Sequence, residues 1–141
     1  MKVTVKIKLL HPDAKLPRLA YRGDACYDIC ALEDTIIPAG KSKLVRSGFA
    51  SEVSEDWEIQ LRPRSHQSYD TYLPSFATLD SNYRGDCGPL LHNFSDKDYQ
   101  VKRGDRVAQM AVRPIPRVTF KVVDELSQSE RGERGFGSSG K

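Results

Sequence analysis

Long apolar runs are absent from this sequence, and no segment of helical length carries a sustained 3.6-residue apolar period. The first eight residues interleave lysines with apolar side chains, whereas a signal peptide or a membrane span requires an unbroken apolar stretch. We therefore expect neither a signal peptide nor a contact with a membrane. The missing helical period favours a fold built from strands.

Cysteine is scarce as well. Cys26, Cys30 and Cys87 are the three cysteines of the chain, and they contain no Cys-x-x-Cys pair. An odd number without such a pair disfavours both a disulfide framework and a structural zinc site. We expect inert buried thiols in a reducing cytoplasm, which would be the host's if the protein is viral.

A large excess of charge of one sign is also missing. The 22 basic and 19 acidic residues leave a net charge of +3 over 141 residues, the length of one ordinary domain. This charge is too small for capture of polymeric nucleic acid along the whole surface. Basic residues interleaved with stacking aromatics are not concentrated on any one strand, which disfavours a single-strand nucleic-acid binder. Any anion site must therefore be local.

Apolar residues at every second position are present in four stretches, and this spacing places them on one face of an extended chain. Turn signals such as Pro38-Ala39-Gly40 and Gly88-Pro89 separate them. The pattern predicts an all-β, jelly-roll-like sandwich or barrel, with one short helix at His66 to Tyr72 that Pro74 would end. The four stretches are Val3-Val5-Ile7, Trp57-Ile59-Leu61, Ala108-Met110-Val112 and Val118-Phe120-Val122.

The composition changes near the C-terminus. Four of the ten residues from Arg131 to Gly140 are glycine, and Phe136 is the only large apolar residue among them. Such a segment cannot bury enough apolar surface to hold a single conformation by itself. Many chain ends are disordered without any function. We predict a catalytic domain at residues 1–126 and a mobile C-terminal arm at residues 127–141.

The tail, residues 131–141, contains groups that match the parts of a nucleotide. Backbone N–H groups freed by glycines and the hydroxyls of Ser138 and Ser139 can surround a phosphate, and the Arg131 guanidinium can pair with two of its oxygens. Phe136 can stack on a base, which is worth about 1–3 kcal/mol. The tail is therefore predicted to close over a nucleoside triphosphate.

Four further clusters lie upstream of the tail. Taken alone, each is an ordinary turn or strand end, where Asp often bonds its own backbone. Together with the tail, their order and spacing resemble the five motifs of the trimeric dUTP diphosphatases, with departures that fit a divergent viral or phage-like member. The resemblance spans nearly the whole chain and implies that family's jelly-roll fold. The clusters are Asp24-Ala25-Cys26-Tyr27-Asp28-Ile29, Pro63-Arg64-Ser65, Leu79-Asp80-Ser81-Asn82-Tyr83-Arg84-Gly85 and Gly104-Asp105-Arg106-Val107-Ala108-Gln109-Met110.

The resemblance implies hydrolysis of dUTP to dUMP and pyrophosphate, by attack of water on the α-phosphorus. Asp80 would be the catalytic base that positions the water. Asp28 would hold Mg²⁺ through bound waters, because this hard cation keeps several waters and few protein ligands. Tyr83 would pack on the deoxyribose and exclude a 2′-hydroxyl.

The same resemblance assigns the remaining substrate contacts. Ser65 and Gln109 would bind phosphates, with support from Arg64. Ala77 and Leu79 belong to the stretch that folds in the family as a hairpin reading uracil through backbone groups. The protein would be a homotrimer with shared active sites, each completed by a neighbour's tail. The tail residues that contact the substrate would be Arg131, Phe136, Gly137, Ser138 and Ser139.

Cys26, His66, Ala77 and Arg134 stand where the family usually has glycine. Each is expected to add bulk or strain, because such glycines often have positive φ or a close backbone neighbour. Since Ala77 lies in the uracil-reading stretch, two alternatives stay open. One is the same reaction on another pyrimidine deoxynucleoside triphosphate, such as dCTP or a base-modified one. The other is a dUTPase-like regulatory or binding protein.

Overall fold

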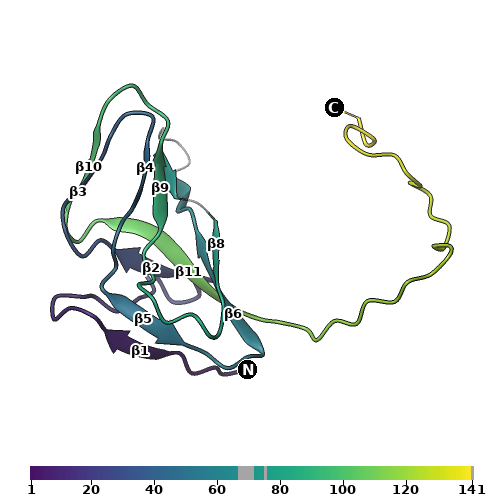
Figure 1. The fold of residues 1–141 in the computed structure, drawn as a ribbon, viewed down its shortest axis with the longest axis horizontal. Coiled ribbons are helices and arrows are strands. Elements are labelled where there is room, and N and C mark those ends of the chain that lie inside the picture. Colours follow the sequence, from purple (N-terminus) through teal and green to yellow (C-terminus); the bar gives the residue numbers. More distant parts are fainter. Residues whose placement is uncertain (67–71, 75, 141) are drawn as a thin grey trace.

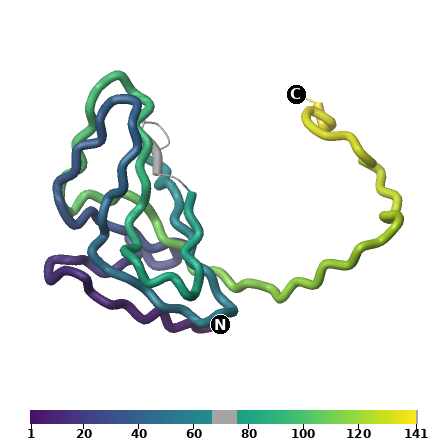
Figure 2. Tube along the Cα trace, viewed as in Figure 1, coloured from purple at the N-terminus to yellow at the C-terminus, as the bar shows by residue number. Residues whose placement is uncertain are grey.

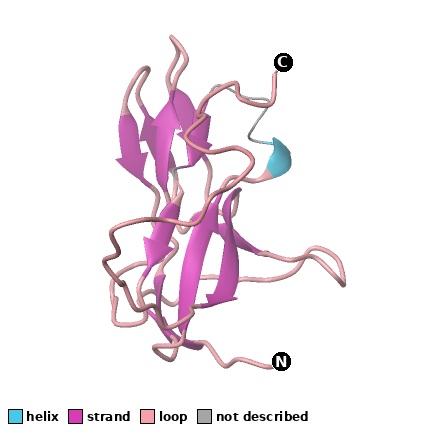
Figure 3. Cartoon of the chain, turned by 90° about the vertical axis from the view of Figure 1, so that its right-hand side faces the viewer, coloured by secondary structure: helices cyan, strands magenta, loops and turns pink. Residues whose placement is uncertain are grey.

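The fold is built from strands. The computed structural model describes residues 1–66, 72–74 and 76–140, and within them the helical structure is a single 3-10 turn at Ser65–His66 (Figure 3). In this part of the chain no helix is long and apolar enough to cross a membrane. The strands in chain order are β1 (Lys6–Leu9), β2 (Tyr27–Cys30), β3 (Thr35–Ile37), β4 (Ser42–Leu44), β5 (Phe49–Glu52), β6 (Trp57–Arg62), β7 (Tyr72–Pro74), β8 (Ala77–Leu79), β9 (Leu90–Asn93), β10 (Tyr99–Val101) and β11 (Arg106–Pro114).

Antiparallel pairing joins the strands into small sheets, which Figure 1 shows packed against one another. The largest sheet has the strand order β2-β11-β6-β8, and a three-stranded sheet has the order β4-β9-β7. Two further pairs are β1-β5 and β10-β3. This arrangement confirms the predicted all-β class, a jelly-roll-like sandwich.

The predicted alternation is confirmed for β6 and explains the core, whereas β11 is buried at adjacent residues such as Met110 and Ala111 and does not alternate. Ile59 and Leu61 of β6 are buried, whereas the residues between them are partly exposed. Met110 of β11 and Phe49 of β5 pack into the same apolar cluster. Each such side chain contributes about 1.5–3 kcal/mol by leaving water. A second cluster consists of Ala31, Ile37, Val45, Leu91, Val101 and Val107.

Three predicted elements differ from the structure. β1 begins only at Lys6, so Val3 and Val5 lie outside the strand, although Val5 still packs against the core. Residues 118–122 form no strand, because no other described segment of the chain pairs with them. The helix predicted at His66 to Tyr72 lies mostly outside the described residues, and Tyr72 itself begins β7.

The strain expected at the four replaced glycine positions is absent. Every described residue with a positive φ is a glycine. Cys26, His66, Ala77 and Arg134 therefore do not have a left-handed backbone conformation, and the effect of their added bulk stays a prediction. In this chain the four positions do not require a left-handed conformation.

The C-terminal segment, residues 115–140, leaves the body after β11. Figures 1 and 2 show it running away from the strands and curling near its end. Its start is fixed, because the Ile115 N–H donates to the Asp56 carbonyl at 2.7 Å and Arg117 pairs with the Asp56 carboxylate at 3.1 Å. Further on, Phe120 and Val122 are 93% and 97% exposed. An apolar row therefore faces solvent in the single chain.

Candidate active site

Two arginines and a carboxylate form a cluster at one end of the largest sheet. Asp28 of β2 lies opposite Gln109 of β11, and Gln109 lies opposite Arg62 of β6. The chain continues from β6 to Arg64, whose Nε donates to Asp28 Oδ1 at 3.1 Å. Arg106, the first residue of β11, donates from Nη1 to Asp28 Oδ2 at 3.3 Å. Strand pairing thus brings together residues that are up to 78 positions apart in the sequence.

This cluster is half-buried and shares a loop with further predicted residues. The side chains of Asp28 and Arg64 are 13% and 20% exposed. The Gln109 Nε2 donates to the Pro63 carbonyl at 2.6 Å, which holds the loop after β6 to the central strand. Ser65 follows in the 3-10 turn and is exposed. Guanidinium groups, an amide and an exposed hydroxyl at a partly dry sheet end are suited to bind an anion such as a phosphate.

A second predicted group lies on the loop that follows β8. The Tyr83 N–H donates to the Asp80 carbonyl at 3.0 Å, so the two residues share a turn. The Tyr83 hydroxyl donates to the Asp86 carbonyl at 3.2 Å. A Cβ on Gly85 would stand 2.2 Å from that hydroxyl oxygen, so a larger residue here would displace the Tyr83 ring. The exposed Asp80 carboxylate and the Tyr83 ring are held on one compact loop.

Asp86 fastens this loop to the body, and sequence reasoning missed it. Its Oδ1 accepts hydrogen bonds from the Ser47 N–H and the Gly88 N–H at 2.9 and 2.7 Å, and its Oδ2 accepts one from the Gly48 N–H at 2.8 Å. A Cβ on Gly88 would lie 1.9 Å from the Val45 carbonyl oxygen. The signal in the sequence was the pair Gly85-Asp86, and this pair indicated only a turn. Its partners at 47 and 48 are 38 or more residues away in the sequence.

The single chain does not bring these two groups together. Asp28 lies on β2 at one edge of the sheet, and Asp80 follows β8 at the other edge, with β11 and β6 between them (Figure 1). Leu79 lies opposite Ile59, three residues before the row of Arg62 and Gln109. With strands about 4.8 Å apart and residues about 3.4 Å apart, Asp80 lies about 14 Å across the sheet and about 13 Å along it from Asp28.

Ala77 and Leu79, the predicted base-reading residues, are both in β8. Ala77 pairs with Leu61, and Leu79 pairs with Ile59. Both side chains are half-buried and pack against the first apolar cluster. Their backbone therefore forms the edge of the largest sheet, next to the Asp80 loop.

The predicted tail residues lie in the C-terminal segment, away from both groups (Figure 1). Arg131 donates from Nε to the Arg134 carbonyl at 2.7 Å, and Arg134 donates back to the Arg131 carbonyl at 3.0 Å. Gly137 has a φ of +76° and turns the chain next to Ser138 and Ser139. Phe136 is fully exposed. The tail thus forms a local curl through its own hydrogen bonds, which its composition did not predict.

The described residues contain no group of three or more His, Cys, Asp or Glu side chains that could hold a metal ion. Asp28 is a single carboxylate beside the phosphate-suited cluster. This donor set can hold a metal ion only weakly without further ligands. It fits a hard cation that takes most of its oxygen ligands from a bound phosphate chain and water.

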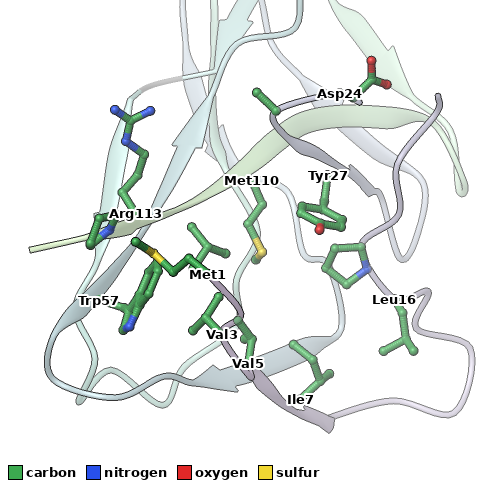
Figure 4. Close-up of a pocket in the computed structure, with 14 residues that line it drawn as sticks. Met1, Val3, Val5, Ile7, Leu16, Asp24, Tyr27, Trp57, Met110 and Arg113 are labelled. Carbon is green, nitrogen blue, oxygen red and sulfur yellow. The ribbon is translucent and has the colours of Figure 1, made fainter. Parts of the chain in front are cut away.

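An apolar groove lies elsewhere on the body (Figure 4). Its volume is about 720 Å³, and none of the predicted site residues lines it. Val3 and Val5 from the N-terminus, Trp57 of β6 and Met110 of β11 point into it (Figure 4). Arg113 and Pro114, at the end of β11, form part of its wall.

The cysteines take no part in either group. All three are free, and Cys30 and Cys87 are buried, whereas Cys26 is half-buried. Burial raises the pKa of the Cys87 thiol, and the Ser51 hydroxyl only partly offsets this. A raised pKa keeps the thiol protonated, and the expected burial is confirmed for Cys87, whereas its inertness stays a prediction.

Comparison with known proteins identifies the class to which this fold and these groups belong. The family model described as dUTPase matches residues 12–140. The chain therefore belongs to the dUTPase family. It is 45% identical over 141 residues to the deoxyuridine 5′-triphosphate nucleotidohydrolase of Clostridium tetani, with 98% of this chain and 97% of that protein covered.

Solved structures agree with this family. The dUTPase of Staphylococcus bacteriophage 80alpha, solved with dUPNHPP, has a TM-score of 0.90 and 28% identity, and the match covers 98% of this chain and 99% of that chain. A point mutant of the phage phi11 dUTPase of S. aureus shares the fold, with a TM-score of 0.80, 22% identity and coverage of 86% of this chain and 97% of that chain. That structure is described as revealing the coordination of a structural Mg(II) ion.

Proposed function

We propose that this protein hydrolyses dUTP to dUMP and pyrophosphate by attack of water on the α-phosphorus. The observation that carries the proposal is the family match over residues 12–140 together with the high identity to a nucleotidohydrolase named for deoxyuridine 5′-triphosphate. The half-buried cluster of Asp28, Arg64, Arg106 and Gln109 supports it, because a triphosphate is the kind of anion that such a cluster suits.

Asp80 is the catalytic base of the proposed reaction. Its exposed carboxylate accepts a proton from the attacking water, and pyrophosphate leaves from the opposite side of the α-phosphorus. Tyr83, held over Gly85 by its hydrogen bond to the Asp86 carbonyl, packs against the deoxyribose. A rigid ring at this position leaves no room for a 2′-hydroxyl.

The phosphates bind at the other group. Arg64 and Gln109 donate to phosphate oxygens, and the exposed Ser65 hydroxyl adds a further donor. Such preorganised donors act more strongly in a partly dry site than in water. In-line attack then depends on positioning, because phosphoryl transfer leaves the protein little covalent chemistry to perform.

The residues at this site are consistent with a divalent metal, and we propose Mg²⁺. Asp28 would hold it through water, together with the phosphates of a bound substrate. When bound, Mg²⁺ offsets the negative charge of the phosphate chain.

The active site is shared between copies in a homotrimer. The position of Asp28 and Asp80 at opposite edges of the largest sheet supports this, because catalysis requires both groups to lie close to one substrate. The exposed apolar row at 118–122 and the apolar groove of the body also fit burial against another copy. Residues 127–141 then act as a mobile arm on a catalytic domain of residues 1–126.

In this arrangement a neighbour's tail closes the site. Arg131, Gly137, Ser138 and Ser139 bind the γ-phosphate end, and the fully exposed Phe136 covers the base. Arg131 must then exchange the carbonyl of Arg134 for phosphate oxygens. A phosphate offers the guanidinium an opposite charge and two oxygens in a bidentate geometry, which a neutral carbonyl does not, and this favours the exchange.

A substrate panel tests the proposed reaction. The protein and Mg²⁺ are incubated separately with dUTP, dCTP, dTTP and UTP, and pyrophosphate release is measured. We expect release from dUTP far above the other three. Release from dCTP with dUTP untouched would move the substrate to another pyrimidine, and binding of dUTP without any release would favour a regulatory protein.

Asp80→Asn tests the role of the base with nearly unchanged shape. We expect kcat to fall about 10²–10⁴-fold while the protein keeps its fold and its affinity for dUPNHPP. Asp96→Asn, at an exposed carboxylate on the loop between β9 and β10, is the matched control and should leave kcat unchanged. Full activity of Asp80→Asn would remove Asp80 from the mechanism.

A further inference from the structure

Arg106 pairs with Asp28, the carboxylate that the proposed function uses to hold the metal ion. Both oxygens of Asp28 are engaged by guanidinium groups, Oδ1 by Arg64 at 3.1 Å and Oδ2 by Arg106 at 3.3 Å. A carboxylate with both oxygens paired in this way is a poor acceptor for the waters around a metal ion. Arginine and metal therefore compete for Asp28.

We propose that Arg106 is an exchangeable counter-ion of Asp28. It pairs with Asp28 while no substrate is present and moves to a phosphate oxygen when the triphosphate arrives, which frees Asp28 for the metal. The inference rests on the proposed function and adds a second arginine to the phosphate site.

The two arginines differ in how firmly they are held. Arg64 is 20% exposed, and it also donates from Nη1 to the Arg106 carbonyl at 3.5 Å. The Arg106 side chain is 47% exposed. Solvent around the exposed half of the Arg106 side chain screens its attraction to Asp28. Arg106 is therefore the partner that can leave Asp28 at little cost.

The backbone at Arg106 also favours a change of direction. The pairing of β11 with β2 shifts register between Arg106 and Ala108, so a bulge lies beside Arg106 at the start of the strand. Bulges bend a strand locally and redirect the side chain next to them. The Arg106 side chain thus begins at an irregular point of the sheet rather than from the middle of a ladder.

Charge supplies the driving force. A bound triphosphate brings several negative charges toward Asp28, and an unpaired carboxylate beside them would be repelled. When Arg106 moves from Asp28 to a phosphate, it pairs with the more highly charged anion. Charge-assisted pairs with phosphate are short and geometrically specific. The metal then neutralises Asp28 through its waters. Asp28 and the phosphates therefore each keep a positively charged partner during the exchange.

The test uses the full-length protein and two probes that do not depend on the base. Mn²⁺ alone is titrated by paramagnetic resonance, and inorganic tripolyphosphate is titrated by calorimetry at saturating Mg²⁺. Arg106→Gln keeps most of the side-chain length without the charge, and Arg106→Lys keeps the charge. Arg103→Gln is the matched control, because Arg103 lies in the turn just before β11, is 60% exposed and pairs with Asp13 at 3.4 Å instead.

We expect Arg106→Gln to move the two affinities in opposite directions. Mn²⁺ should bind about three- to tenfold more tightly, because its competitor for Asp28 is gone, and tripolyphosphate should bind more weakly by a similar factor. Arg106→Lys should restore most of the tripolyphosphate affinity. The double variant Asp28→Asn with Arg106→Gln should lose the gain in Mn²⁺ affinity, and Arg103→Gln should change neither affinity.

A purely structural role gives a different result. If Arg106→Gln weakens both ligands together, or changes neither, the exchange is overturned. This failure is distinguishable from failure of the proposed function. Opposite shifts in a protein that leaves dUTP uncleaved would support the exchange and reject dUTP hydrolysis, whereas dUTP cleavage without opposite shifts would do the reverse.

Discussion

Phe49 and Phe136 show how differently the body and the C-terminal segment use the same side chain. Phe49 lies in β5 with no exposed surface and packs among Ile29, Ile59 and Met110. Phe136 is fully exposed on a segment without strands. In the body, an apolar side chain is used for stability. In the C-terminal segment, an equally apolar side chain contributes nothing to the fold of the chain and is available to a ligand or to another copy.

The same contrast applies to the arginines. Arg64 pairs with a mostly buried carboxylate of another strand. Arg131 bonds only nearby carbonyls of its own tail in the described structure, at Arg134 and Gly135. The phosphate cluster is thus assembled by the fold, whereas the tail carries its groups as a local curl. A site that needs both must wait for the tail to arrive, as lids do.

Removal of the tail should reduce dUTP turnover strongly and leave the fold of the body unchanged, which is the largest expected difference between the two regions. A chain that ends at Glu130 keeps all the strands and both apolar clusters, so it should fold and assemble as before. We expect kcat/KM for dUTP to fall by about 10²-fold or more, because the γ-phosphate and base contacts are lost. Scattering mass and steady-state kinetics measure the two quantities, and normal turnover would refute the role of the tail.

Replacement of each phenylalanine by alanine should separate stability from binding. Phe49→Ala leaves a cavity in the core, and we expect the free energy of unfolding to fall by about 3–5 kcal/mol. Phe136→Ala should change that free energy by less than about 0.5 kcal/mol. Loss of base stacking should instead raise KM for dUTP by about tenfold. Denaturant unfolding and kinetics of both variants check this, and equal destabilisation by the two would contradict the contrast.

Cys26 and Cys87, both in the body, should differ in their reactivity, and this effect is expected to be the smallest. Burial raises the pKa of Cys87, so its reactive thiolate is scarce at pH 8. A disulfide reagent should therefore modify the half-buried Cys26 first and Cys87 only after unfolding. The raised pKa also means that its contribution to stability is complete below the ordinary thiol pKa and is lost as the pH rises from there through the folded-state value. Fast labelling of Cys87 at pH 8 would contradict its burial.

The sequence predicted the strands with regular alternation and the chemical groups of the five clusters. Period-two apolar patterns indicated both β6 and β11, but only the burial of β6 alternates, whereas β11 also has adjacent buried residues. The strand expected at 118–122 has the same pattern but no partner among the described strands of this chain. Periodicity reports which face is apolar, not which backbone lies beside it.

The contacts that the sequence could not predict are long-range ones. Asp86 binds Ser47 and Gly48, and Arg106 binds Asp28, over separations of 38 to 78 residues. Such pairs depend on strand order and register, which no single motif contains. For the same reason, the distance between Asp28 and Asp80 became visible only in the sheet. The motifs predicted which residues belong to the site. The order of the strands supports a site that takes Asp28 and Asp80 from different chains.

Complementation between two inactive variants tests that division most directly. Asp28→Asn chains and Asp80→Asn chains are co-expressed with different tags, and mixed oligomers are purified through both tags. In a cyclic trimer whose sites each take Asp28 from one chain and Asp80 from the next, every mixed trimer contains one intact site, so dUTP turnover should recover to about a third of the wild-type value. Homotrimers of either variant should stay nearly inactive. Mixed oligomers as inactive as the two homotrimers would show that one chain supplies both carboxylates, and would contradict the shared site.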